Sequence, residues 1–172
     1  MSHESQMGRM RISFDLDEVL FVSDKTHKTE PPLRFPLNRL YVERLRQGTP
    51  ELVQRLQQLG YEVWVYTSSL RSERYIKGLF RCYGVRFDGI VNGHRHLKEV
   101  QRDRREKLPQ KLPNHYRISL HVDDEMVICS LGRQYGFRTY HLDAQDDEWV
   151  EKIIRRAEEV KRLERPDLSD AQ

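Results

Sequence analysis

Two aspartates spaced one residue apart, Asp15 and Asp17, end an apolar run in the segment ISFDLDEVLF at residues 12–21. Carboxylates that converge at the end of a strand can hold a divalent cation and supply a nucleophile. Taken alone, however, such a pair more often marks a strand end with a turn or a helix-capping acid. The pair indicates a functional site only if other parts of the chain supply further polar groups that can lie next to it.

Two further polar clusters follow predicted strands. One is the acidic pair Asp123 and Asp124, and the other is a run of hydroxyl side chains at residues 67–69. The carboxyl ends of parallel strands meet at one edge of a sheet, which is where open α/β folds bind their ligands. The clusters therefore predict a single site at that edge.

The apolar periodicity and the turn residues predict short strands that alternate with helices. We expect strands at 11–16, 61–66, 87–91, 118–122 and 137–142, and helices at 50–59, 125–135 and 147–163, with a further helix that starts after Ser69 or Ser72 and runs to Tyr83. Thr49 is the predicted N-cap of the first helix, and Ser69 or Ser72 that of the second. Alternating strands and helices imply a Rossmann-like three-layer α/β/α sandwich with a parallel sheet of about five strands.

The remaining segments have no clear helix or strand pattern. Residues 22–48 contain three prolines and are expected to form a small flap or loop. Residues 92–117 are dense in lysine and arginine, which most often indicates a solvated face or loop. We expect residues 1–172 to form a single domain whose ends, 1–10 and 166–172, are flexible.

Composition narrows the class of protein. The 30 lysines and arginines against 27 acids give a net charge of +3, which neither indicates nor excludes a nucleic-acid partner. Cys82 and Cys129 predict no disulfide or zinc site and are expected to be reduced thiols in or near the core. Without a long apolar segment or a signal peptide, we expect a cytoplasmic protein with no membrane partner.

The clusters have the groups that phosphoryl transfer needs. Two carboxylates can hold one Mg²⁺ together with a phosphate oxygen. Asp15 can then attack phosphorus, while Asp17 protonates the leaving oxygen and later activates water. The hydroxyl and amide groups of Thr67 and Ser68 can hold phosphoryl oxygens, and a lysine would supply positive charge.

In this order and spacing, the motifs resemble those of the haloacid dehalogenase-like (HAD) phosphohydrolases. The segment at 15–19 resembles the first motif and Thr67 the second, while Lys111, in a Lys-x-Pro segment, resembles the third and Asp123 with Asp124 the fourth. The resemblance covers nearly the whole chain. Within the family, the chain is similar to an uncharacterised bacterial branch. Because only short segments separate the motifs, it implies a minimal cap or none.

The resemblance implies a role for each matching residue. Asp15 would be the nucleophile, Asp17 the acid/base, Thr67 a catalytic phosphate ligand and Lys111 the stabiliser of charge. The implied Mg²⁺ ligands are Asp15, the carbonyl of Asp17, and Asp123 or Asp124. The candidate substrate contacts are Thr67, Ser68, Arg71 and Lys111. From the residues alone, Lys107 and Lys98 remain alternatives to Lys111.

Histidines offer a weaker signal. His94 and His96 alternate without a third ligand nearby, so we expect them on a loop rather than at a metal. His121 lies inside a predicted strand and is expected to be a hydrogen-bonded packing residue.

The sequence thus predicts a Mg²⁺-dependent phosphatase that forms an aspartyl phosphate on Asp15. An open site would admit a large phosphorylated substrate. Two alternatives remain, namely a phosphotransferase that uses the same site and a non-catalytic module that binds a phosphorylated ligand. The oligomeric state is not determined.

Overall fold

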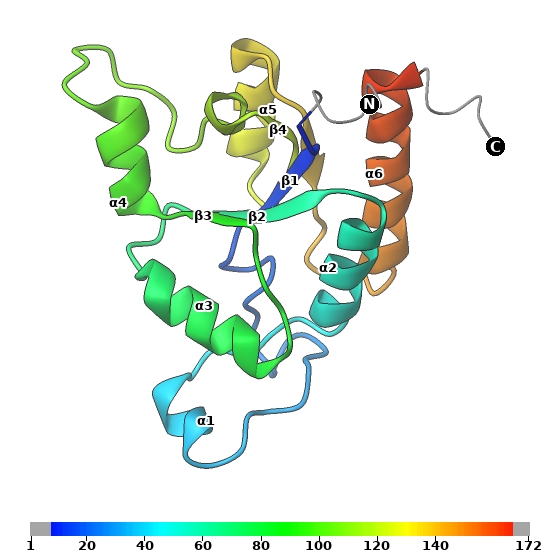
Figure 1. The fold of residues 1–172 in the computed structure, drawn as a ribbon. Coiled ribbons are helices and arrows are strands. Elements are labelled where there is room, and N and C mark those ends of the chain that lie inside the picture. The colour runs from blue at the N-terminus through cyan, green and yellow to red at the C-terminus, as the bar shows by residue number, and fades with distance from the viewer. Residues whose placement is uncertain (1–7, 167–172) are drawn as a thin grey trace, which may run out of the picture.

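The structure, a computed structural model, describes residues 8–166 of the chain. A parallel sheet in the order β3-β2-β1-β4-β5 forms its centre (Figure 1). The strands are β1 (Arg11–Phe14), β2 (Glu62–Tyr66), β3 (Gly89–Val91), β4 (Ile118–Asp123) and β5 (Thr139–His141). Since β1 is the middle strand, Asp15 lies at the middle of the carboxyl edge.

Helices cover both faces of this sheet. The longer helices are α2 (Thr49–Gln58), α3 (Glu73–Cys82), α5 (Met126–Tyr135) and α6 (Trp149–Glu164). The short ones are α1 (Leu37–Leu40), α4 (Gly93–His96), the π-helix η2 (Leu97–Gln101) and the 3₁₀-helix η3 (Pro113–Tyr116). None of the helices within residues 8–166 is both long enough and apolar enough to cross a membrane.

The two faces of the sheet differ in chemistry, because successive side chains of a strand point to opposite faces. One face carries Ile12, Val65 and Leu120, which pack with α2, α3 and α6 in the larger apolar cluster. The other face carries a smaller aromatic cluster that includes Trp64 and Tyr66 and is covered by η2 and η3. Figure 1 shows α2 and α3 on one side of the sheet and α4 and α5 on the other. The predicted three-layer α/β fold class is confirmed.

One predicted helix cap is confirmed and one is wrong. The hydroxyl of Ser72 accepts a hydrogen bond from the Tyr75 amide at the start of α3. Helix α2 instead begins after Gly48, and Thr49 is its first helical residue, with a hydroxyl that donates to the Arg46 carbonyl at 2.7 Å. Gly48 has a φ of 92°, a left-handed conformation that threonine rarely adopts.

The charged segment at 92–117 is more regular than predicted. It contains α4, η2 and η3, and the side chain of Asn92 caps α4. His94 and His96 do not lie on a loop but on α4. His96 is buried, with its Nδ1 2.6 Å from the hydroxyl of Tyr66. These helices are short and bury few residues, among them Val100, so the sequence has no clear helical periodicity here.

Two further residues lie elsewhere than predicted. Met10, expected in the flexible N-terminal tail, is buried, and its carbonyl accepts a hydrogen bond from the Glu62 amide at 2.8 Å. Cys82, expected in or near the core, is exposed at the end of α3. The predictions for residues 1–7 and 167–172 fall outside the described residues.

A flap of residues 22–48 packs beside the loop that follows β1. Arg46, near the end of the flap, is buried, and its guanidinium donates to the carbonyls of Val19 at 2.8 Å and Glu18 at 2.9 Å. These hydrogen bonds attach the loop that carries Asp17 to the flap.

Replacing Arg46 with methionine should lower the free energy of unfolding by about 3 kcal/mol, because the carbonyls of Val19 and Glu18 lose charge-assisted hydrogen bonds to a buried guanidinium. Chemical denaturation would measure the change. Arg39→Met, at an exposed position of the same flap, should change stability by less than about 0.5 kcal/mol. Equal effects of the two substitutions would contradict the role given to Arg46.

Candidate functional site

Asp15 is a buried carboxylate at the carboxyl end of the central strand, only 5% exposed. Its Oδ1 accepts a hydrogen bond from the Leu16 amide at 2.8 Å, and its Oδ2 lies 3.1 Å from Nζ of Lys111. Burial raises the pKa of Asp15, Lys111 opposes this effect, and Asp123 adds to it. The carboxylate is therefore crowded by negative charge and held by one cation.

Lys111 is the lysine that the fold brings to this carboxylate. Its side chain is 1% exposed, and its Nζ lies 2.5 Å from Oδ2 of Asp123 and 3.1 Å from Oδ2 of Asp15. Burial lowers the pKa of Lys111, but the two carboxylates outweigh it and raise the pKa, so the side chain stays charged. Lys98 and Lys107, the alternatives left open by the sequence, are exposed.

A buried tyrosine fixes the backbone next to Lys111. The hydroxyl of Tyr66 accepts a hydrogen bond from the amide of Leu112 at 2.9 Å and contacts His96. Tyr66 is completely buried on the aromatic face of the sheet. The segment before β4 is thereby attached to β2, which directs Lys111 toward the site. Sequence reasoning missed this role, since a tyrosine in a strand is ordinary.

Buried polar side chains form a series of hydrogen bonds that ends at Asp123. Nε2 of His121 lies 2.9 Å from Oδ2 of Asp123, and its Nδ1 lies 2.7 Å from Oγ of Ser13, the residue paired with it across β1 and β4. Burial lowers the pKa of His121, so the neutral ring donates from Nε2 to Asp123 and accepts the Ser13 proton. The predicted packing histidine therefore also orients a site residue.

The carboxylates of Asp15, Asp123 and Asp124 form a group that could hold a metal ion, with oxygens all within 4.8 Å of one another. Burial raises the pKa of Asp124, and Asp123 raises it further. Three carboxylates against the single ammonium of Lys111 leave negative charge unbalanced. Hard oxygen donors with a deficit of positive charge fit Mg²⁺.

Asp17 lies apart from this buried group and is exposed. Arg71 donates from Nη1 to its Oδ2 and from Nη2 to its Oδ1, each at 3.0 Å. The predicted acid/base and a predicted substrate contact are therefore paired with each other. The sequence placed both near the site, but the spacing did not predict this pair.

The predicted phosphate-binding residues follow β2, next to the strand of Asp15. Thr67 is 1% exposed, and its hydroxyl oxygen accepts a hydrogen bond from the Ser69 amide at 3.1 Å. Within residues 8–166 the hydroxyl proton has no acceptor, so it is available for an anion. Ser68 is exposed beside it.

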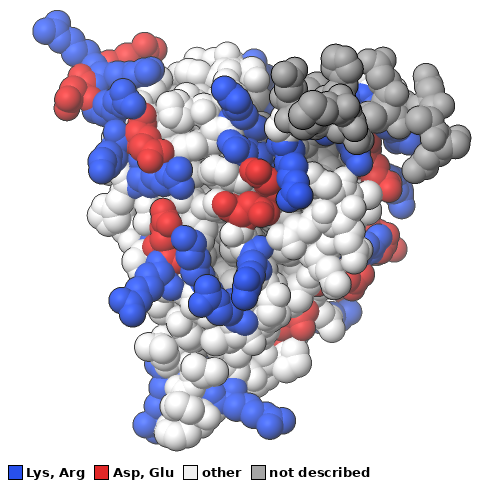
Figure 2. Space-filling view, viewed as in Figure 1, with Lys and Arg blue, Asp and Glu red and all other residues white. Residues whose placement is uncertain are grey.

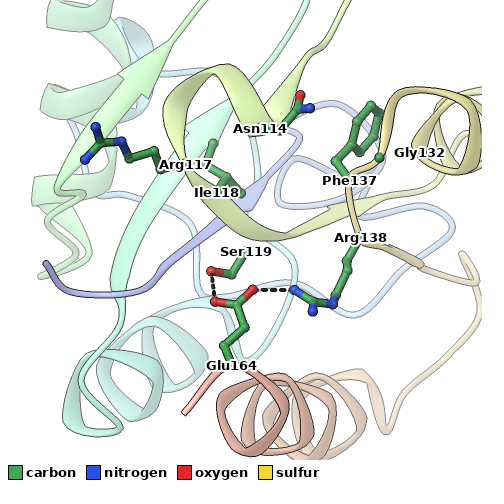
Figure 3. Close-up of a pocket in the computed structure, with 9 residues that line it drawn as sticks. Asn114, Arg117, Ile118, Ser119, Gly132, Phe137, Arg138 and Glu164 are labelled. Atoms are coloured by element: carbon green, nitrogen blue, oxygen red, sulfur yellow. Dashed lines mark hydrogen bonds and ion pairs between the residues drawn. The ribbon is translucent and has the colours of Figure 1, made fainter. Parts of the chain in front are cut away.

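A cavity of about 520 Å³ lies at the opposite, amino-terminal edge of the sheet (Figure 3). Its lining includes Ser119, Arg138 and Glu164, and Glu164 accepts a hydrogen bond from Ser119 and pairs with Arg138. None of the predicted site residues lines this cavity. This cavity is therefore separate from the candidate site, which we locate from its side chains at the carboxyl edge of the sheet.

The surface charge is mixed. Figure 2 shows lysine and arginine side chains interspersed with acids over the face in view, including the projecting loop after η2 at the upper left. Residues 102–107 of that loop are all exposed and contain Asp103 and Glu106 as well as basic residues. The loop fits the interpretation of a solvated charge run.

No protein-family model and no curated protein matches the chain, whereas solved structures do. An uncharacterized protein from Listeria monocytogenes serotype 4b is 21% identical with a TM-score of 0.51, over 81% of this chain and 80% of that one. A HAD-superfamily hydrolase, subfamily IA, variant 1, from Geobacter sulfurreducens PCA is 15% identical with a TM-score of 0.49, over 78% and 89%. The HAD domain of the effector protein Lem4 from Legionella pneumophila is 14% identical with a TM-score of 0.49, over 86% and 92%.

At such identities the similarity concerns the fold alone. The Listeria structure shares it over about four fifths of each chain. The five-stranded parallel sheet is the Rossmann-like α/β fold that the sequence predicted, and its acidic cluster lies beyond the central strands.

Replacing Lys111 with methionine should lower the free energy of unfolding by about 3–5 kcal/mol, because Asp15 and Asp123 would lie buried without their counter-charge. Lys107→Met, at an exposed position, should change it by less than about 0.5 kcal/mol. Urea denaturation at neutral pH without added metal measures both. A small effect of both substitutions would mean that the buried ion pairs do not form in solution.

Proposed function

We propose that the protein is a Mg²⁺-dependent phosphatase that hydrolyses phosphate monoesters through an aspartyl phosphate on Asp15. The observation that carries this proposal is the buried contact of Asp15 with Lys111, within reach of the carboxylates of Asp123 and Asp124. Gathering buried acids around one cation is costly for a folded chain. Such an arrangement is more typical of a reaction centre than of a packing contact.

Asp15 acts as the nucleophile in this proposal. A carboxylate oxygen forms a bond to phosphorus while the bond from phosphorus to the leaving oxygen breaks. The hydrogen bond from the Leu16 amide holds one oxygen of Asp15 and so limits rotation of the carboxylate. Lys111 neutralises charge on the phosphoryl group, and the hydroxyl of Thr67 and the amide of Ser68 donate to its oxygens.

Asp17 carries the protons. It gives one to the leaving oxygen and later takes one from the water that hydrolyses the aspartyl phosphate. Its exposed position suits this task, because both the leaving group and water arrive from solvent. The environments of the two aspartates differ strongly, which is how two identical side chains take different roles.

The site residues also fit a bound cation. Mg²⁺ would offset the negative charge of substrate and carboxylates and orient the phosphate. Asp15, the carbonyl of Asp17 and one or both of Asp123 and Asp124 would hold it. Both oxygens of Asp123 already accept hydrogen bonds, whereas the Asp124 carboxylate bonds only its own amide among the described residues. We therefore favour Asp124 as the direct ligand.

Two alternatives use the same residues differently. A phosphotransferase would pass the phosphoryl group from Asp15 to an acceptor other than water. A module that only binds a phosphorylated ligand would need the cations but neither a nucleophile nor an acid/base. The small flap leaves room for a large phosphorylated substrate in each case.

Asp15→Asn should reduce Mg²⁺-dependent hydrolysis of p-nitrophenyl phosphate by more than about 10³-fold, because the amide is not a nucleophile. Lys111→Ala should reduce it by about 10²-fold or more, and Lys107→Ala by less than about twofold. The assay is colorimetric and is run with Mg²⁺ and with EDTA. Turnover that persists in Asp15→Asn would refute the aspartyl-phosphate route, and tight ligand binding without turnover in the wild type would favour the module.

Asp124→Asn should weaken Mg²⁺ binding, measured by calorimetry, by about tenfold or more while leaving the metal-free stability close to that of the wild type. Asp123→Asn should also lower stability, because the charged side chain of Lys111 loses a buried partner. If Asp124→Asn binds Mg²⁺ like the wild type, Asp124 is not a ligand.

A further inference from the structure

One arginine joins the carboxylate of Asp17 to the flap. Arg71 donates to both oxygens of Asp17 at 3.0 Å, and its Nε donates to Oε1 of Glu43 at 2.9 Å. A single guanidinium therefore bridges two carboxylates, one from the loop after β1 and one from the flap.

Several further contacts hold Arg71 in place. Its Nη1 also donates to Oγ of Ser69 at 2.9 Å, and its carbonyl accepts a hydrogen bond from the side-chain amide of Asn92 at 2.9 Å. The guanidinium lies 5.3 Å from the centroid of the Phe21 ring. Four of the five N–H donors of the guanidinium thus have partners.

Glu43 is also held by a second partner. Its side chain is 16% exposed, and its second oxygen accepts a hydrogen bond from the hydroxyl of Tyr75 on α3. The neighbouring Tyr41 packs its ring 5.2 Å from that of Tyr75. Gly78 of α3 permits this approach, since an added Cβ would lie 2.1 Å from the Tyr41 hydroxyl. The flap is therefore docked on α3 at the point where Glu43 meets Arg71.

From these contacts we infer that Glu43 is a positioning residue for the reaction, because it holds Arg71, which in turn holds the Asp17 carboxylate. The inference rests on the proposed function in taking Asp17 as the acid/base. An aspartate whose side chain is 54% exposed would otherwise sample several rotamers. The planar fork of an arginine restricts it to one orientation.

The substitution Glu43→Gln tests this inference with little change of shape. Glu43 uses both oxygens, one for Arg71 and one for Tyr75, whereas an amide has a single acceptor oxygen. The variant therefore loses the negative charge that pairs with Arg71 and keeps only one oxygen that can accept a hydrogen bond. Glu30→Gln is the matched control, because Glu30 is also a half-buried flap carboxylate, but among residues 8–166 its side chain accepts a hydrogen bond only from the Gly48 amide.

We expect Glu43→Gln to lower kcat for p-nitrophenyl phosphate by about tenfold to a hundredfold and to change KM by less than about threefold. Glu30→Gln should change kcat by less than about twofold. Since Glu43 acts through Arg71, adding Glu43→Gln to an Arg71→Ala variant should have no further effect. Equal losses in Glu43→Gln and Glu30→Gln, or additive losses in the double variant, would overturn the inference.

A second measurement separates this inference from the proposed function. The Nε–H of Arg71 should exchange slowly with water in ¹⁵N NMR spectra of the wild type and faster in Glu43→Gln, but not in Glu30→Gln. A wild type without turnover would refute the proposed function, and the NMR signal would still test the contact. Unchanged exchange in Glu43→Gln would then overturn the role of Glu43.

Discussion

The carboxyl edge of this sheet depends on the buried ammonium of Lys111 between Asp15 and Asp123. A carboxylate removed from water is strongly destabilising unless a counter-charge and hydrogen bonds replace its hydration. Lys111 supplies the counter-charge for two such groups at once. The irregular segment before β4 must therefore cross the aromatic face of the sheet to deliver it, and the Tyr66 hydroxyl fixes that path.

This requirement explains why the two faces of the sheet differ. One face is covered by three helices over an apolar cluster and contributes mainly stability. The other has polar side chains at the centre of the sheet, namely Ser13, Tyr66 and His121, each hydrogen-bonded and buried. Polar groups in these positions stabilise the fold less than packed aliphatic ones would, but they orient Asp123 and the segment that carries Lys111.

The two aspartates of the first motif have different surroundings. Asp15 is buried and restrained by a backbone amide and Lys111, while Asp17 is exposed and restrained by Arg71. The flap adds a further constraint through Glu43, which accepts a hydrogen bond from Arg71. A short insertion can thus influence a neighbouring site by holding a side chain in place.

Much of the fold was predictable. The five strands and the four longer helices lie within a few residues of their predicted positions, because alternating apolar residues, glycines and prolines act over a few residues of chain. The start of α2 was mispredicted, since a left-handed glycine took the place of a side-chain cap. The helices at 93–101 were missed because so few of their residues are buried. The roles of the site residues remain predictions.

The sequence by itself determined which polar residues end the strands, and therefore that Asp15, Asp17, Thr67, Asp123 and Asp124 lie along one edge. This information is local, since it depends on strand periodicity and on the rule that parallel strands end together. Only the tertiary structure decided that Lys111, and not Lys98 or Lys107, reaches Asp15. It also decided that Glu43 reaches Asp17 through Arg71. Such contacts join segments distant in the chain, and their partners are fixed by packing and register, which no short sequence pattern specifies.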